Sequence, residues 1–381
     1  MKLAIFTAGN DGKKLYEIIK KIRNAKVLYF VDNNPNLLGK KICDNKKIIS
    51  PYLLKKYIDN KIIDMVLLPS TRMISFGLEE YINQLEGLNI YQYKIVPSYV
   101  LRKRNLEESD YKKLEEIIFR EGYRQINQLQ HLQFHVIDKC NLNCKRCQHF
   151  SNLVRDDKLA DFNGLYNDLK RLRELFDDIN VIAILGGEPL LNPELDKYCE
   201  MVRKLYPYSK LEIITNGLLI KSMSNDLIKS IVDNDILINI SYYPVLSSVI
   251  DDIVEFLQKK EIKYTIGKRI TTFSKKMTLV DCENVDVRKR FESCRDRCCT
   301  TLRNGRLYPC YLPATIEYFN KEFDEFINTD DSYIDIYDKE ITGMEILSRI
   351  KKGFSICRYC TEEKEYTWEQ SRIVDKSDWL V

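Results

Sequence analysis

Three cysteines within eight residues constrain this chain more than any other feature of its sequence. Cys140, Cys144 and Cys147 have the spacing C-x3-C-x2-C and follow directly on an apolar stretch typical of a β-strand. The chain has twelve cysteines among 381 residues. At that frequency the spacing would arise by chance roughly 0.01 times, so we interpret the triplet as one functional unit. Three thiolates on one short loop can bind a single metal centre.

Two kinds of metal centre fit such a loop. Zinc in a structural site takes four protein ligands, and His149 is the nearest candidate for the fourth. Three cysteines without a fourth ligand at matching spacing instead favour a [4Fe–4S] cluster that leaves one iron open. The spacing therefore predicts a cluster with Cys140, Cys144 and Cys147 as its ligands.

Composition excludes several classes of protein. Hydrophobic residues make up 44% of the chain and charged residues 30%, which is typical of a globular rather than a disordered protein. A net charge of +4 is too weak to predict nucleic acid as a partner. The chain has no apolar run of membrane-spanning length and no evident signal peptide, so we expect no membrane span and a cytoplasmic location. In that reducing compartment, cysteines are expected as metal ligands rather than as disulfides.

Strands that alternate with helical stretches predict an α/β fold with parallel sheets. The predicted parts are a Rossmann-like sheet at 1–105, a helical linker at 106–130, a partial (βα)6 barrel similar to a TIM barrel at 131–285, and a small cysteine-rich domain at 286–381, to which the family resemblance described below adds an iron–sulfur cluster. Strands are expected at 2–6, 26–31, 64–68, 132–137, 181–185, 211–215, 237–241 and 262–266. The acidic stretch from Asp330 to Glu340 is expected to be a solvated loop.

A glycine-rich turn follows the second expected strand of the barrel. Gly186, Gly187 and Glu188 precede Pro189. Glycine lets the backbone approach a ligand closely, and a carboxylate beside it can accept hydrogen bonds from an ammonium group. A plain strand-to-helix turn, with proline at the start of the helix, explains the same residues.

The cysteine loop and this turn together resemble the radical S-adenosylmethionine (SAM) superfamily. In that family the open iron binds the amino and carboxylate groups of the methionine moiety. Electron transfer then yields a 5′-deoxyadenosyl radical that abstracts a substrate hydrogen. The resemblance implies a [4Fe–4S] cluster and SAM as cofactors, and it assigns Gly186, Gly187 and Glu188 to the methionine amino group. The residue before the third cysteine is usually aromatic in the family, and here it is Arg146.

Two further strand ends match positions that contact the cofactor in similar enzymes. Asn216 and Ser241 each lie at the end of an expected strand, and the resemblance places both near SAM. Ligands of a βα barrel bind at the carboxyl ends of its strands, although turn chemistry alone explains Asn216 equally well. The sequence assigns no catalytic acid or base, and Tyr242 and Tyr243 are candidates by position only.

The last quarter of the chain contains a second group of cysteines. Cys310 ends a predicted hairpin, while Cys357 and Cys360 form a C-x2-C pair. The group resembles the family's SPASM-like auxiliary-cluster domain in its shorter twitch form. The resemblance implies one further [4Fe–4S] cluster, held by Cys310, Cys357, Cys360 and either Cys299 or Cys294. A structural zinc ribbon uses a four-cysteine set of the same kind. The isolated cysteines, expected to be packed thiols, are Cys43, Cys199 and Cys282.

A glycine motif follows the first expected strand. Gly9 and Gly12 open a helix, and Asp32 ends the next strand. This is the layout of a dinucleotide-binding unit, with phosphate at the helix N-terminus and the carboxylate on ribose hydroxyls, although Thr7 replaces the first glycine. The region resembles the Rossmann-like N-terminal domains of bacterial sugar-modifying acyltransferases and methyltransferases, which bind a nucleotide-sugar or serve as docking modules. A scaffold that binds nothing has the same pattern.

These features together predict a radical SAM enzyme of oxidoreductase or isomerase type. The expected reaction is dehydrogenation, epimerisation or dehydration of a carbohydrate or nucleotide-sugar. The expected partners are this small-molecule substrate and a reducing electron donor such as flavodoxin or ferredoxin. One alternative is a peptide-modifying maturase of the same superfamily, although such enzymes commonly carry an N-terminal winged-helix module where this chain has strand–helix–strand. The other alternative is a non-catalytic, zinc-stapled binding protein.

Overall fold

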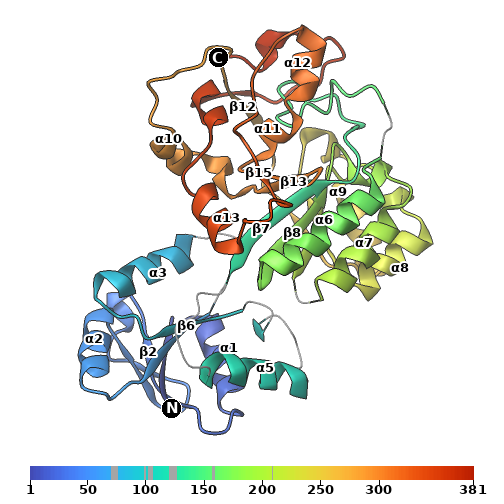
Figure 1. Cartoon of the computed structure of the whole chain (residues 1–381). Coiled ribbons are helices and arrows are strands. Elements are labelled where there is room, and N and C mark those ends of the chain that lie inside the picture. The colour runs from blue at the N-terminus through green and yellow to red at the C-terminus, as the bar shows by residue number, and fades with distance from the viewer. Residues whose placement is uncertain (70–75, 98–99, 102–105, 120–126, 157–158, 208) are drawn as a thin grey trace. The chain divides into compact units, whose positions relative to one another are not determined.

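The computed structural model describes residues 1–381 except for 70–75, 98–99, 102–105, 120–126, 157–158 and 208 (Figure 1). Contacts divide the chain into one unit of residues 1–130 and a second unit of residues 131–381. Each unit has a largely parallel sheet accompanied by helices, so the predicted α/β class is confirmed. No helix in the described part of the chain is long and apolar enough to cross a membrane.

The first unit contains a six-stranded sheet in the order β3-β4-β2-β1-β5-β6. Its strands are β1 (Lys2–Phe6), β2 (Lys26–Val31), β3 (Lys41–Ile42), β4 (Lys46–Ile49), β5 (Met65–Pro69) and β6 (Tyr93–Val96). Its helices are α1 (Asn10–Ile19), α2 (Pro51–Asp59), α3 (Phe76–Gly87) and α5 (Glu108–Phe119). All pairs except β3 with β4 are parallel, and the chain order reverses beside β1. This is the strand order of a Rossmann-like sheet, as predicted.

Buried runs and helix caps explain why these elements form. Four consecutive residues of β1, Leu3 to Phe6, are buried, which requires cover on both faces of the sheet. Ser50 caps α2 by accepting from Leu53 N, and Pro51 occupies its first turn. The predicted linker at 106–130 contains α5, and residues 120–126 of this linker lie outside the described part of the chain.

The second unit contains an eight-stranded sheet in the order β11-β10-β9-β8-β7-β13-β14-β15. Its first five strands in the chain are β7 (Gln128–His135), β8 (Asp178–Leu185), β9 (Lys210–Thr215), β10 (Leu237–Ile240) and β11 (Tyr264–Ile266). The helices that follow them are α6 (Phe162–Leu175), α7 (Leu195–Leu205), α8 (Asn225–Asp233) and α9 (Ile250–Lys259), which lie side by side along the sheet (Figure 1). Neighbours among these five strands are consecutive in the chain, and a helix follows each of the first four, which is the arrangement of a βα barrel.

The C-terminal part of the chain extends this same sheet. The remaining strands are β12 (Thr272–Met277), β13 (Thr301–Arg303), β14 (Arg306–Tyr308), β15 (Ile334–Asp335) and β16 (Cys360–Thr367). The remaining helices are α10 (Val287–Ser293), α11 (Tyr311–Thr315), α12 (Glu317–Phe323) and α13 (Gly343–Ile350). β13 pairs in parallel with β7, whereas β12 and β16 form a separate antiparallel pair. A division between residues 285 and 286 stays a prediction.

The structure corrects the prediction that the acidic stretch from Asp330 to Glu340 is a solvated loop. This stretch contains β15, and Ser332 and Ile336 are fully buried at 0% exposure. Ile334 on β15 pairs with Leu307 on β14, so the stretch adds an edge strand to the sheet. The prediction was wrong because it weighed the aspartates of this stretch and overlooked its isoleucines, Ile334 and Ile336, which are buried.

Candidate functional site

The cysteine loop, residues 140–147, follows β7, and the charges of its three thiols affect one another's pKa values. Burial raises the pKa of Cys140, and the charges of Cys147, Glu188 and Cys144 raise it further. Burial also raises the pKa of Cys144 to about 12, with an added effect of Cys147. The three cysteines that the spacing selected therefore lie within electrostatic range of one another, and Glu188 lies within electrostatic range of Cys140.

Hydrogen-bond donors of the loop itself point at Cys147. Burial raises the pKa of this thiol, while backbone N–H groups of Ser151, His149 and Asn152 oppose the rise by stabilising the thiolate. Three thiolates with peptide donors are a suitable ligand set for an iron–sulfur cluster. Among the described residues, no group of three or more His, Cys, Asp or Glu side chains is placed to hold one metal ion, so the structure shows no single-ion site at the loop, and a cluster on Cys140, Cys144 and Cys147 stays a prediction.

Glu188 is the anchor of a buried polar network beside the loop. Its side chain is 0% exposed and accepts hydrogen bonds from Thr215 Oγ1 at 2.7 Å and from Asn216 N at 2.9 Å. Asn216 Nδ2 donates to Asn141 Oδ1 at 2.7 Å and lies 3.8 Å from Cys140 Sγ. The ends of β8 and β9 and the cysteine loop thus converge, which places the predicted residues Glu188, Asn216 and Cys140 in one site.

The protonation of Glu188 should control SAM binding near neutral pH. Burial raises the pKa of Glu188 to about 7, although hydrogen bonds from Asn216, Thr215 and Leu190 lower it. A carboxylate binds the methionine ammonium group better when it is ionised, so affinity rises as the pH rises through this pKa. Between pH 6 and pH 7, where the ammonium group of SAM stays charged, we expect the dissociation constant to fall about fivefold. Equilibrium dialysis with cluster-loaded protein measures this, and a constant affinity would contradict the assignment.

Gly186 and Gly187 are required by the packing of the chain against itself. A Cβ at Gly186 would lie 2.1 Å from Ile137 O, and one at Gly187 would lie 2.3 Å from Lys139 O. The N–H groups of Gly187 and Glu188 donate to these same two carbonyl oxygens, each over 2.9 Å. The glycines thereby fasten Glu188 to the segment that leads into the cysteine loop. A contact between these glycines and the cofactor stays a prediction.

The end of β10 adds an aromatic residue to the site. Ser241 N donates to Thr215 O over 2.9 Å, which places Ser241 beside the end of β9. Burial raises the pKa of Tyr243 well above its usual value, and the charges of the cysteine loop and Glu188 add to this rise. The ring of Tyr243 lies 5.6 Å from that of Trp368, whose indole N–H reaches Cys144 Sγ over 3.3 Å. We missed Trp368 in the sequence because it lies far along the chain in a region without a recognisable motif.

The second group of cysteines lies around the buried Lys276. Burial raises the pKa of Cys360 to about 12, Lys276 opposes the rise, and Cys357 and Cys294 add to it. Burial also raises the pKa of Cys310, where Lys276 again opposes and Cys360 and Cys357 contribute. Cys360 therefore lies within electrostatic range of three other predicted ligands, Cys294, Cys310 and Cys357.

Cys299, the other candidate for the fourth auxiliary ligand, also lies within electrostatic range of Lys276 and Cys294. Burial raises its pKa to about 12, and Asp296, Cys298 and Cys294 raise it further. Cys294 acts on both Cys357 and Cys360. The fourth ligand, Cys294 or Cys299, stays a prediction.

The glycine motif of the first unit forms the predicted turn between β1 and α1. A Cβ at Gly12 would lie 2.0 Å from Thr7 O, so glycine is required where α1 packs on the end of β1. Thr7, in the place of the first glycine, has φ +119°, a conformation that favours glycine. Asp32 accepts from Ala8 N at 2.9 Å and holds the turn that contains Gly9 against the end of β2. The structure thus brings Gly9, Gly12 and Asp32 together.

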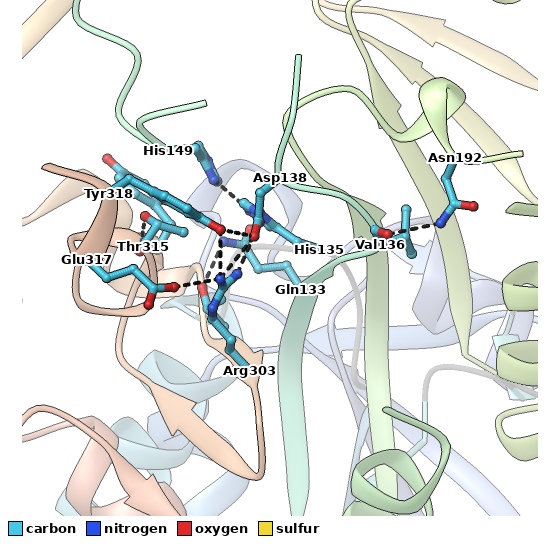
Figure 2. Close-up of polar contacts among 12 residues, drawn as sticks. Gln133, His135, Val136, Asp138, His149, Asn192, Arg303, Thr315, Glu317 and Tyr318 are labelled. Carbon is cyan, nitrogen blue, oxygen red and sulfur yellow. Dashed lines mark hydrogen bonds and ion pairs between the residues drawn. The ribbon is translucent and has the colours of Figure 1, made fainter. Parts of the chain in front are cut away.

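A cavity of about 1030 Å³ opens beside β7 in the second unit. Asp138 lines this cavity. Figure 2 shows its carboxylate beside His135, Arg303 and Tyr318. Arg303 donates twice to the Asp138 carboxylate, at 3.1 and 2.9 Å, and also reaches Glu317 at 2.7 Å. Burial raises the pKa of Asp138, but His135 and Arg303 outweigh burial and hold this pKa well below its usual range. No motif in the sequence indicates this network, because the partners of Asp138 come from β7, β13 and α12.

Asp138→Asn should destabilise the second unit. The change leaves Arg303 and the Tyr318 hydroxyl without their shared charged acceptor inside a half-buried network. We expect a loss of about 2–3 kcal/mol in the free energy of unfolding, measured by chemical denaturation. Glu317→Gln is the matched control, because this side chain is 64% exposed and its ion pair with Arg303 should contribute less than about 1 kcal/mol. Equal effects of the two changes would show that the network does not depend on Asp138.

Comparison with known proteins identifies the domain that contains the cysteine loop. Residues 134–243 match the Radical SAM superfamily. GTP 3′,8-cyclase of Clostridium acetobutylicum is 29% identical over 131 residues, which cover 34% of this chain and 40% of the cyclase. GTP 3′,8-cyclase of Helicobacter pylori strain HPAG1 is 32% identical over 142 residues, which cover 36% of this chain and 41% of the cyclase. The match therefore spans about two fifths of the length of these relatives.

A solved structure gives a weaker likeness over a larger part of the chain. The structure of BtrN in complex with AdoMet and 2-DOIA has a TM-score of 0.39 and 17% sequence identity, and the likeness covers 61% of this chain and 93% of BtrN. The matched superfamily region contains the cysteine loop, the Glu188 turn, Asn216 and Ser241. The chain therefore carries a radical SAM domain at residues 134–243, whose cofactors are a [4Fe–4S] cluster and SAM.

Proposed function

We propose that this chain is a radical SAM enzyme that abstracts a hydrogen atom from a carbohydrate or nucleotide-sugar. The observation that carries the proposal is the convergence of Cys140, Asn216 and Glu188 at the strand ends. When bound, the cluster supplies one electron that cleaves SAM to methionine and a 5′-deoxyadenosyl radical. Cys140, Cys144 and Cys147 would hold the cluster, and the Glu188 carboxylate would orient the methionine ammonium group.

The first unit supports a nucleotide-sugar as the substrate class. Gly9, Gly12 and Asp32 lie at the carboxyl ends of β1 and β2, beside the point where the strand order reverses. Ligands of open α/β sheets bind at this position. The reactions that fit a substrate carbon radical are dehydrogenation, epimerisation and dehydration. A parallel α/β sheet at the N-terminus also differs from the winged-helix module that a peptide maturase commonly carries.

The second group of cysteines supports an auxiliary [4Fe–4S] cluster on Cys310, Cys357, Cys360 and either Cys294 or Cys299. Such a cluster would accept an electron from the substrate radical or anchor the substrate. The first cluster would receive its electron from a cytoplasmic donor such as flavodoxin or ferredoxin. Anaerobic purification with iron counting tests this: about eight irons per chain support two clusters and about four support one. Colourless protein with zinc would instead favour the non-catalytic binding protein.

Asp32→Asn should weaken the binding of a nucleotide-sugar to the full chain. An asparagine at this position offers ribose hydroxyls one neutral acceptor in place of a carboxylate, so we expect the dissociation constant for a UDP-sugar to rise about tenfold. Formation of 5′-deoxyadenosine without substrate should not change. Asp59→Asn, on the exposed side of α2, is the control.

Calorimetry with a UDP-sugar and with GTP in parallel measures this effect. GTP is included because the curated relatives are GTP 3′,8-cyclases. Binding of GTP but not of the UDP-sugar would move the proposal to a nucleotide substrate. Binding of neither ligand by wild-type protein would leave the first unit as a docking module.

A further inference from the structure

The C-terminal segment, residues 366–381, is fastened to the cysteine loop. Cys144 and Gln370 form an isolated antiparallel β-bridge. One residue further on, Ser371 N donates to Asn143 O over 2.8 Å. Backbone pairing of this kind holds the segment in register with the loop, so side chains that flank the bridge have fixed positions relative to the thiols.

Both tryptophans of the chain belong to this segment, and both donate their indole N–H to the loop. Trp368 Nε1 lies 3.3 Å from Cys144 Sγ. Trp379 Nε1 lies 2.8 Å from the carbonyl oxygen of Cys147. One tryptophan thus donates to a sulfur atom and the other to a backbone oxygen, and this difference provides a matched pair of variants.

The indole of Trp368 is held in place by its neighbours. Its ring lies 5.6 Å from the ring of Tyr243 with an interplanar angle of 30°, and Tyr243 in turn meets Phe273 edge-on at 5.9 Å. An indole has one N–H and no acceptor, so the sulfur of Cys144 is the only acceptor that this side chain has among the described residues. The hydrogen bond is therefore directed by packing rather than by a chance rotamer.

We propose that Trp368 is a positioning residue that raises the reduction potential of the [4Fe–4S] cluster. A reduced cluster carries one more negative charge than an oxidised cluster, so a donor to a ligating sulfur stabilises the reduced form more. The proposal rests on the proposed function only in requiring a cluster on Cys140, Cys144 and Cys147. It does not depend on the identity of the substrate.

Trp368→Phe in the full chain tests the proposal. Phenylalanine keeps an aromatic ring against Tyr243 but removes the N–H. After anaerobic loading with iron and sulfide, we expect a midpoint potential about 59 mV more negative than wild type, which corresponds to a tenfold change in the equilibrium of a one-electron reduction. Redox titration followed by electron paramagnetic resonance measures the potential. Cys144→Ala protein identifies which signal belongs to this cluster, because only that signal should be lost.

Trp379→Phe is the control, since it removes a donor to a backbone oxygen and should leave the potential within a small fraction of that shift. A wild-type potential in Trp368→Phe protein would overturn the proposal. In Trp379→Phe protein Trp368 is the sole tryptophan, and its fluorescence should be quenched when this cluster assembles but not in a Cys144→Ala background. Absence of that quenching would also overturn the proposal, even if Trp368→Phe protein failed to load. If Trp368→Phe protein shows the expected shift in potential but wild-type protein forms no 5′-deoxyadenosine, the proposed function is refuted and the role of Trp368 stands.

Discussion

Replacing Cys144 by alanine is expected to abolish reductive cleavage of SAM. Cys144 is 5% exposed, and its thiol lies within electrostatic range of Cys147 and accepts a hydrogen bond from the N–H of Trp368. A cluster that loses one of three protein ligands is held far more weakly than one that loses an outer hydrogen bond. We expect formation of 5′-deoxyadenosine with dithionite to fall at least about 1,000-fold, with a loss of about four irons per chain.

Cys43→Ala is the control for that experiment. Cys43 lies in the first unit, whereas both groups of cysteines belong to the second. The iron content of the Cys43→Ala protein and its formation of 5′-deoxyadenosine should equal those of wild type. Retention of SAM cleavage by the Cys144→Ala protein would refute the assignment of the loop as the cluster site.

Replacing Glu188 by glutamine is expected to weaken SAM binding about 100-fold. One carboxylate oxygen accepts from Thr215 Oγ1 and Leu190 N, and the other accepts from Asn216 N. Glutamine turns one of these acceptors into a donor that faces another donor, and it removes the charge that binds an ammonium group. Loss of a charge-assisted hydrogen bond contributes about 1.5–3 kcal/mol. Equilibrium dialysis of cluster-loaded protein measures the dissociation constant.

The rise of SAM affinity between pH 6 and pH 7 should also disappear in the Glu188→Gln protein. Glutamine does not titrate, so its dissociation constant should be the same at both pH values. Glu194→Gln is the control, because Glu194 pairs with Lys197 at the surface of α7. A Glu188→Gln protein that keeps both wild-type affinity and its pH dependence would show that another group binds the ammonium.

The sequence predicted strands best where they are continuous apolar runs bounded by turns. β1 and β2 lie where they were expected, at residues 2–6 and 26–31. β7 begins at Gln128, four residues before the expected start, because its first half is polar. Buried Gln133 on this strand donates to Thr301 Oγ1 on β13, 168 positions away. A polar strand that is stabilised by such a distant partner has no local apolar pattern to predict it.

The candidate site divides in the same way. The cysteine triplet, the Glu188 turn and Asn216 could be selected from the sequence because each is a short motif at the end of a strand. The sequence could not predict which hydrogen bonds join these motifs, and the structure provides them. Asp138 with Arg303 was missed, because a single aspartate and a single arginine 165 positions apart form no pattern.

Local spacing along the chain was sufficient to predict the three thiols, the radical SAM resemblance and the alternation of strands and helices. These features depend on contacts between residues close in sequence, which spacing alone reflects. Only the folded chain showed that Glu188 is buried and that Trp368 donates to Cys144 from 224 positions away. Burial and long-range hydrogen bonds set the charge and the potential of the site, and they arise when distant segments pack together.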